Sequence, residues 1–134
     1  MKKPVGIDVS RLSERHWEKD AQKGKLLLDA RILHERGQED AASELYAVIA
    51  SLEEELMQHC QSVAVWPVFF SHAFSAVHCW AKAGNFYRAR QLCTAILTHP
   101  EITPALREKA ELILSALREG QQAFLQSSQQ KIAA

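Results

Sequence analysis

The chain has 134 residues, of which 47% are hydrophobic and 24% are charged. This length is typical of one domain with enough apolar side chains for a core that needs no metal or disulfide. The 16 basic and 16 acidic residues balance. The balance argues against a nucleic-acid binder, which usually carries a basic excess, and against a polybasic membrane anchor.

The cysteines and the apolar segments indicate in which cellular compartment the protein is expected. Cys60, Cys79 and Cys93 are widely spaced and form no CxxC motif, which favours a reducing compartment. Residues 1–8 lack the apolar segment of a secretory signal, and no apolar run reaches the roughly 20 residues of a membrane span. We therefore expect a cytoplasmic protein that neither crosses nor coats a membrane.

The first half of the chain predicts a helical hairpin after an irregular arm at residues 1–12. Ser13, followed by an acid, is typical of a helix start. Apolar residues then recur at helical spacing as far as Arg36, and Gly37 predicts the end of the helix. A second stretch with the i, i+3, i+4, i+7 pattern runs to about Cys60. The short gap at Gly37 predicts an antiparallel pair.

The second half predicts another hairpin. Pro67 favours a helix start that runs to Gly84, and a further helix follows as far as Pro100. No segment alternates with the period of two that marks a strand. The sequence therefore predicts an all-α fold.

A fifth helix is expected to begin at Thr103-Pro104, which combines an N-cap residue with a proline in the first turn. It is expected to end near Gly120. The following residues 121–134 are rich in Gln and Ser and are expected to fray. The expected organisation is thus an arm at 1–12, one helical-repeat domain at 13–120 and a tail at 121–134.

The two predicted hairpin turns share a pattern. Gly37 and Gly84 each end a helix, and an alanine follows five positions later, at Ala42 and Ala89. An alanine at this position would lie where the two helices cross, since a small side chain allows their backbones to approach. The chain therefore contains an internal repeat.

Residues 81–90, AKAGNFYRAR, together with Pro100, resemble the tetratricopeptide-repeat family, and residues 33–42 are a weaker copy. The resemblance implies a right-handed superhelix of two antiparallel hairpins in which the fifth helix caps the array. The two turn glycines lie 47 residues apart, compared with a usual repeat of about 34. The additional length is expected in the second helix and in the linker to Pro67.

The resemblance also implies a binding surface, because in this family the first helix of each hairpin lines a concave groove for a peptide or a partner's helix. Arg31 and Lys82 would make this groove cationic and Phe74 would be its apolar floor, which suits an acidic or carboxylate-terminated ligand. A simpler interpretation places Phe74 in the core and the others on ordinary surface. The matching positions are Leu27, Arg31, His34, Ser71, Phe74, His78 and Lys82.

The histidines and cysteines do not show the close spacing of a metal site, so we expect no metal and no cofactor. Cys79 follows His78 directly, but neighbouring residues of a helix point about 100° apart, which argues against a nucleophile and its base. The run Glu53-Glu54-Glu55 is expected to be a solvated helix surface. No enzymatic activity is therefore expected.

These observations predict a non-enzymatic protein–protein interaction module, such as an adaptor, a chaperone or a regulatory subunit. Its partner would be another protein or peptide, of acidic character, rather than a nucleic acid or a membrane. One alternative is a homodimer or other oligomerisation domain that buries exposed Trp17, Trp66 and Phe69 against a second copy. Another is a small helical enzyme or ligand-binding bundle.

Overall fold

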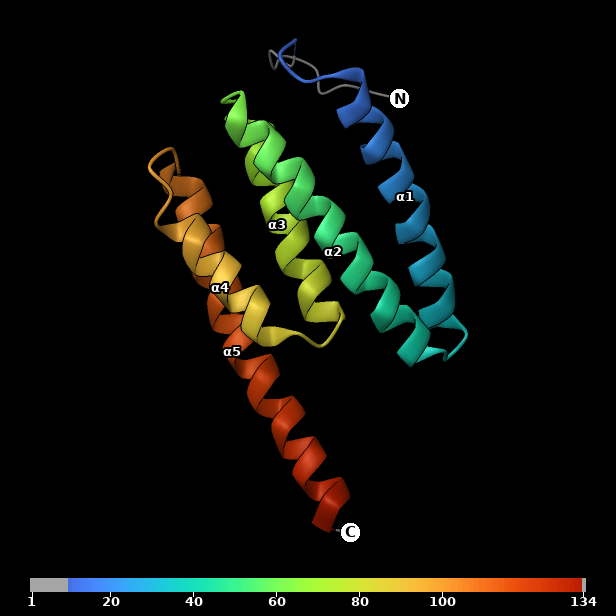
Figure 1. Ribbon diagram of the computed structural model, residues 1–134. Helices are drawn as coiled ribbons and strands as arrows, with labels where there is room; N and C mark the ends of the chain where they lie inside the picture. Colours follow the sequence, from blue (N-terminus) through green and yellow to red (C-terminus); the bar gives the residue numbers. More distant parts are fainter. Residues whose placement is uncertain (1–9, 134) are drawn as a thin grey trace.

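The computed structural model describes residues 10–133, with side chains described as far as Ala123. These residues form helices joined by short turns and contain no strand (Figure 1). The expected all-α class is therefore confirmed, whereas residues 1–9 of the expected arm lie outside the described part. The helices in chain order are α1 (Glu14–Glu35), α2 (Glu39–Ser62), α3 (Trp66–Lys82), α4 (Phe86–Leu97) and α5 (Pro104–Ala133).

Polar side chains cap the start of three helices. The side-chain oxygens of Ser13, Asn85 and Thr103 each accept a hydrogen bond from the backbone amide three residues later, at 3.2, 3.0 and 3.2 Å. Each cap satisfies one of the amides that the first helical turn leaves without a partner. The expected starts after Ser13 and Thr103 are therefore confirmed.

Three of the four connections use the same turn. Gly37, Ala64 and Gly84 have φ angles of 75°, 57° and 82°. In each turn the amide of the next residue donates to a carbonyl five residues earlier, at 2.9, 3.0 and 2.9 Å. This left-handed termination satisfies carbonyls at the helix end. The α2–α3 connection is thus as tight as the two expected hairpin turns, and no extended linker precedes Pro67.

The consequence of these turns is a continuous series in which each helix packs antiparallel against the next (Figure 1). The most extensive contact joins α2 to α3, the pair that the repeat interpretation assigned to different hairpins. A tetratricopeptide-like superhelix remains a prediction.

The expected end of the fifth helix near Gly120 is wrong, because α5 continues to Ala133. A glycine inside a helix costs only about 1 kcal/mol relative to alanine, so it need not end one. A Cβ atom added at Gly120 would lie 3.4 Å from the ring of Phe86, at ordinary contact distance. The fraying expected for residues 121–134 remains a prediction, and the expected apolar anchors Phe124 and Leu125 lie outside the described side chains.

The larger part of the core lies among α2, α3, α4 and α5, and α5 covers α4. Ala110 and Leu117 of α5 are buried, and the Cys93 thiol of α4 donates to the carbonyl oxygen of Ala110 at 3.2 Å. The turn alanines, Ala42 and Ala89, are both buried, as expected for points where helices cross. The expected capping position of the fifth helix is confirmed.

The aromatic residues of the oligomerisation alternative are not available on the surface. Trp17 and Phe69 are only 3% and 4% exposed, because both pack into the core of their own chain. Trp66 is half-buried, with its ring centroid 5.0 Å from that of His99. The expected exposure is therefore wrong for Trp17 and Phe69.

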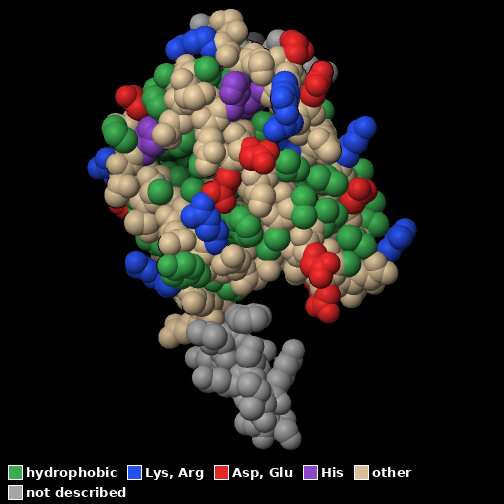
Figure 2. All heavy atoms as spheres, viewed as in Figure 1, with side chains coloured by type: hydrophobic (Ala, Val, Ile, Leu, Met, Phe, Trp, Pro, Cys, Tyr) green, Lys and Arg blue, Asp and Glu red, His purple; other side chains and the backbone are tan. Residues whose placement is uncertain are grey.

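The charged side chains on the face shown in Figure 2 are scattered, and neither sign gathers into one large patch. Among the described residues, no helix combines the length and the apolar character that a membrane span requires.

Candidate functional site: a groove between α1 and α3

A groove with a volume of about 330 Å³ opens where α1 and α3 face each other across α2. Three helices enclose it, so its lining side chains converge from several directions. The lining residues are Leu27 and Arg31 of α1, Tyr46 and Glu53 of α2, and Ser75, His78, Cys79 and Lys82 of α3. We call this surface the α1–α3 groove.

Two cations stand on opposite walls of the groove. Arg31 and Lys82 are exposed, and among the described residues neither forms an ion pair. The ammonium group of Lys82 lies 5.2 Å from the centroid of the Tyr46 ring, within the range of a cation–π contact. The groove thus combines charge at its rim with an aromatic surface beneath it.

The other groove side chains supply uncharged polar and apolar contacts. His78 is exposed at its edge but partly desolvated, and this partial desolvation, followed by the charges of Lys109 and Lys82, lowers its pKa. This histidine is therefore neutral at pH 7, with one nitrogen that donates and one that accepts. Burial, and then the charge of Glu53, raise the pKa of Cys79 to about 11, so this residue is a thiol rather than a nucleophilic thiolate at neutral pH.

Four of the seven groove residues expected from the sequence lie together here: Leu27, Arg31, His78 and Lys82. The expectation for Phe74 is wrong, because its ring is buried in the larger core, 4.5 Å from the ammonium group of Lys109. Each step of four residues turns a helix by about 40°, so Phe74 lies about 80° from Lys82 around α3. The floor is formed by Tyr46 instead.

His34 and Ser71 are exposed but do not line the groove. The Nδ1 atom of His34 lies 2.9 Å from a carboxylate oxygen of Glu39 at the first turn. Ser71 lies one helical turn before Ser75, which takes the position expected for it. The groove is therefore shorter than the resemblance implied.

The resemblance missed Tyr46 and Glu53, because it assigned groove positions only to the first helix of each hairpin. The two residues are seven positions apart on α2, a spacing that places them on one face of a helix. That spacing, read together with the apolar pattern around it, is the signal that could have identified them.

The expected solvated run Glu53-Glu54-Glu55 is wrong for two of its members. Glu53 is fully buried, and Glu54 is half-buried, where it accepts hydrogen bonds from Arg88 and, at 2.7 Å, from the Trp80 indole. Only Glu55 is exposed, with an ion pair to Lys19. Glu53 and Glu54 therefore connect helices, whereas Glu55 faces water.

Glu53, which lines the groove, belongs to a group of polar side chains from α1, α2 and α3. Its Oε1 atom accepts from the ammonium group of Lys23 at 3.2 Å and lies 2.9 Å from Nδ1 of His72. Lys23 also binds Asp20 at 2.9 Å, and Nε2 of His72 lies 3.3 Å from Nε2 of His16. We call these five residues the buried polar cluster.

Burial and neighbouring charges shift the pKa values of two members of the buried polar cluster. Burial alone would lower the pKa of Lys23, but the charge of Glu53 and the hydrogen bond to Asp20 outweigh it and raise the value. Burial, followed by the charges of His72 and His59, lowers the pKa of His16 to about 4. The ammonium group of Lys23 is therefore shared between the carboxylates of Asp20 and Glu53, whereas no ion pair is formed by the two cations of the rim within the described part of the chain.

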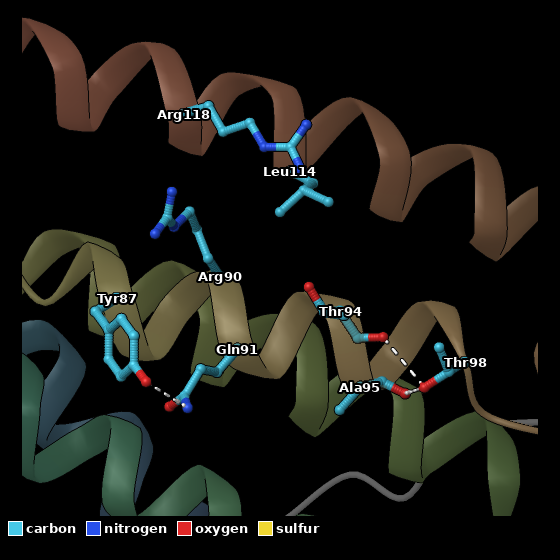
Figure 3. A pocket seen from close by; sticks show the side chains of 8 residues that line it. All are labelled: Tyr87, Arg90, Gln91, Thr94, Ala95, Thr98, Leu114 and Arg118. Atoms are coloured by element: carbon cyan, nitrogen blue, oxygen red, sulfur yellow. Dashed lines mark hydrogen bonds between the residues drawn. The ribbon is translucent and has the colours of Figure 1, made fainter.

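A second hollow lies between α4 and α5, where Arg90 and Arg118 lie across from each other (Figure 3). Tyr87 accepts a hydrogen bond from Gln91 at its edge, at 3.1 Å. Most of its lining residues are exposed on the outer surface of only two helices. The α1–α3 groove, which is enclosed on three sides, is the better candidate for specific binding.

Comparisons with known proteins found no match among family models, curated proteins or solved structures.

Proposed function

We propose that this protein is a non-enzymatic interaction module whose α1–α3 groove binds an acidic segment of a partner protein. The observation that carries the proposal is the pair of cations, Arg31 and Lys82, that face each other across the groove without ion-pair partners among the described residues. Guanidinium and ammonium groups recognise carboxylates through charge-assisted hydrogen bonds.

The remaining side chains favour a peptide as the ligand. Leu27 and Tyr46 offer apolar surface beside the two cations, whereas Ser75 and neutral His78 can pair with the polar groups of a peptide backbone. A carboxylate held between Arg31 and Lys82 would leave a neighbouring apolar side chain over Tyr46. This combination suits a segment in which an acidic residue or a C-terminal carboxylate adjoins an apolar one.

The chemistry of the groove supports binding rather than catalysis. Cys79 is held as a thiol, and a thiol is a weak nucleophile compared with its thiolate. His78 is its neighbour on α3, and successive helical residues do not face each other. We propose that the groove holds its ligand without altering it.

The experiment measures binding of short fluorescent peptides that contain acidic and apolar residues, with free and with amidated C-termini. Arg31→Glu and Lys82→Glu should each weaken binding about tenfold, and added salt should weaken binding to the unaltered protein, because exposed charges act through attraction that salt screens. Arg107→Glu is the matched control, since Arg107 is exposed on α5 and does not line the groove.

Thermal unfolding of the same variants separates a binding defect from a folding defect. Both rim positions are exposed, so their substitutions should change stability little. The proposal is contradicted if no peptide of this class binds, or if Arg107→Glu weakens binding as much as the two rim variants do.

A further inference from the structure

His16 and His72 of the buried polar cluster lie close to Cys60, and the three residues bring three potential metal ligands together inside the protein. They come from α1, α2 and α3 and are 3%, 0% and 5% exposed. A nitrogen of each histidine and the sulfur of Cys60 all lie within 4.8 Å of one another. We propose that these three residues form a zinc site.

The distance between the two histidines fits this ion. Their Nε2 atoms are 3.3 Å apart, whereas two nitrogens bound to one tetrahedral zinc at about 2.0–2.1 Å are about 3.3–3.4 Å apart. Imidazole nitrogen and thiolate sulfur are both ligands that zinc takes, and three protein ligands leave the fourth position open.

Glu53 orients one of the ligands. Its carboxylate lies 2.9 Å from Nδ1 of His72, and an ionised carboxylate can only accept, so Nδ1 carries the proton. In the neutral ring, Nε2 then has a free lone pair that points toward His16. A carboxylate on the far nitrogen of a histidine is the usual arrangement around zinc, where it fixes the tautomer and the orientation of the ring.

A neighbouring set of ligands is already filled by a cation of the protein itself. Asp20, Glu53 and His72 also lie close enough together to hold a metal. However, the ammonium group of Lys23 binds Asp20 at 2.9 Å and Glu53 at 3.2 Å. A cation of the protein thus already bridges the two carboxylates, and we assign the added ion to the histidine and cysteine atoms.

A hollow and an additional histidine lie beside the proposed zinc site. A hollow of about 200 Å³ is lined by His16 and His59, among other residues, so it borders the proposed site at His16. The ring centroid of His59 lies 5.3 Å from that of His16, and its Nε2 atom is buried without a hydrogen-bond partner. Water entering through the hollow can fill the fourth position. Metal binding releases the Cys60 proton, because the ligand is the thiolate.

The test uses the untagged full-length protein, stripped with a chelator and then supplied with zinc or cobalt(II). Metal analysis after gel filtration should find one zinc per chain, and zinc should raise the thermal midpoint of the stripped protein. Cobalt(II) should give the intense absorption of a tetrahedral site together with a charge-transfer band from thiolate sulfur.

Variants assign the ligands. Cys60→Ser should abolish the thiolate band. Cys93→Ser alters an equally buried cysteine that is not part of the proposed zinc site, and this variant should keep the band. His16→Gln and His72→Gln should lose stoichiometric zinc, and Glu53→Gln should weaken zinc binding about 10–100-fold. Far-ultraviolet circular dichroism checks that each variant folds, and Cys60→Ala replaces Cys60→Ser if the serine variant does not.

The proposal is overturned if the stripped protein takes up no stoichiometric zinc. It is equally overturned if the cobalt protein lacks a thiolate band, or if that band survives removal of the Cys60 sulfur. Because the site lies outside the α1–α3 groove, failure here would leave peptide binding by the groove untouched, and failure of peptide binding would leave the zinc site untouched.

Discussion

At the scale of single residues, Ala64 carries a backbone conformation that alanine disfavours. Its φ angle of 57° lies in the left-handed region, where the corresponding turns use Gly37 and Gly84. A side chain with a Cβ atom costs about 1–2 kcal/mol there, and glycine avoids this cost. The α2–α3 turn thus keeps its geometry despite a local strain, because the helices on both sides pack extensively against each other.

Ala64→Gly should therefore stabilise the protein by about 0.5–1 kcal/mol, once the greater chain entropy of glycine in the unfolded state is subtracted. Chemical denaturation measures the change. Ala116→Gly, at an exposed position within α5, is the control and should destabilise by about 1 kcal/mol. Equal destabilisation by both substitutions would show that the turn at Ala64 is not left-handed.

Glu53 is a fully buried carboxylate, so its removal should affect stability. It accepts from both Lys23 and His72, and neither partner is freely solvated. Glu53→Ala should cost about 1–3 kcal/mol, because it leaves the buried Nδ1 of His72 without its partner, whereas Lys23 keeps Asp20. Glu55→Ala, which removes an exposed ion pair with Lys19, should cost less than about 1 kcal/mol. Equal effects in urea denaturation would contradict the buried pairing.

The position of Glu53 could have been predicted from the phase of its helix. Ile49, Glu53, Leu56 and Cys60 follow one another at steps of four, three and four, and all four are buried. The three adjacent glutamates are the same residue type, but only Glu53 lies on the helix face that these apolar residues form. Its partners could not be predicted in the same way, since Lys23 and His72 lie on other helices and are brought together only by tertiary packing.

At the scale of helices, the sequence predicts boundaries well where local chemistry determines them. Ser13 and Thr103 cap helices, and Gly37 and Gly84 end them, because each satisfies backbone groups within a single turn. The α2–α3 turn was missed because alanine gives no signal for a left-handed conformation. The continuation of α5 beyond Gly120 was missed because this glycine predicted a helix end, although a glycine need not end a helix.

The cap formed by α5 leads to a prediction about truncation. Ala110 and Leu117 are buried against the preceding part of the core, which includes Leu92 and Cys93 of α4. A chain that ends before Thr103 would expose this surface and should aggregate or lose cooperative unfolding. Light scattering and circular dichroism detect either result. A soluble truncated chain that unfolds with unchanged cooperativity would show that α5 is a detachable arm.

At the scale of the whole molecule, α1 and α3 are parallel helices that flank α2 (Figure 1). His16 and His72 bridge them near their first turns, whereas the α1–α3 groove opens between their later turns. The charge of the rim was predictable from the sequence through Arg31 and Lys82. The floor was not, because the inward position of Tyr46 depends on how α2 packs between its neighbours.

The α1–α3 groove as a site for acidic peptides is the central claim, and nuclear magnetic resonance of the isotope-labelled protein tests it most directly. On titration with an acidic peptide that has a free C-terminus, the largest amide shifts should map to Leu27, Arg31, Ser75, His78 and Lys82. Shifts centred on Arg90 and Arg118, between α4 and α5, or no saturable shifts with any peptide of this class, would contradict the claim.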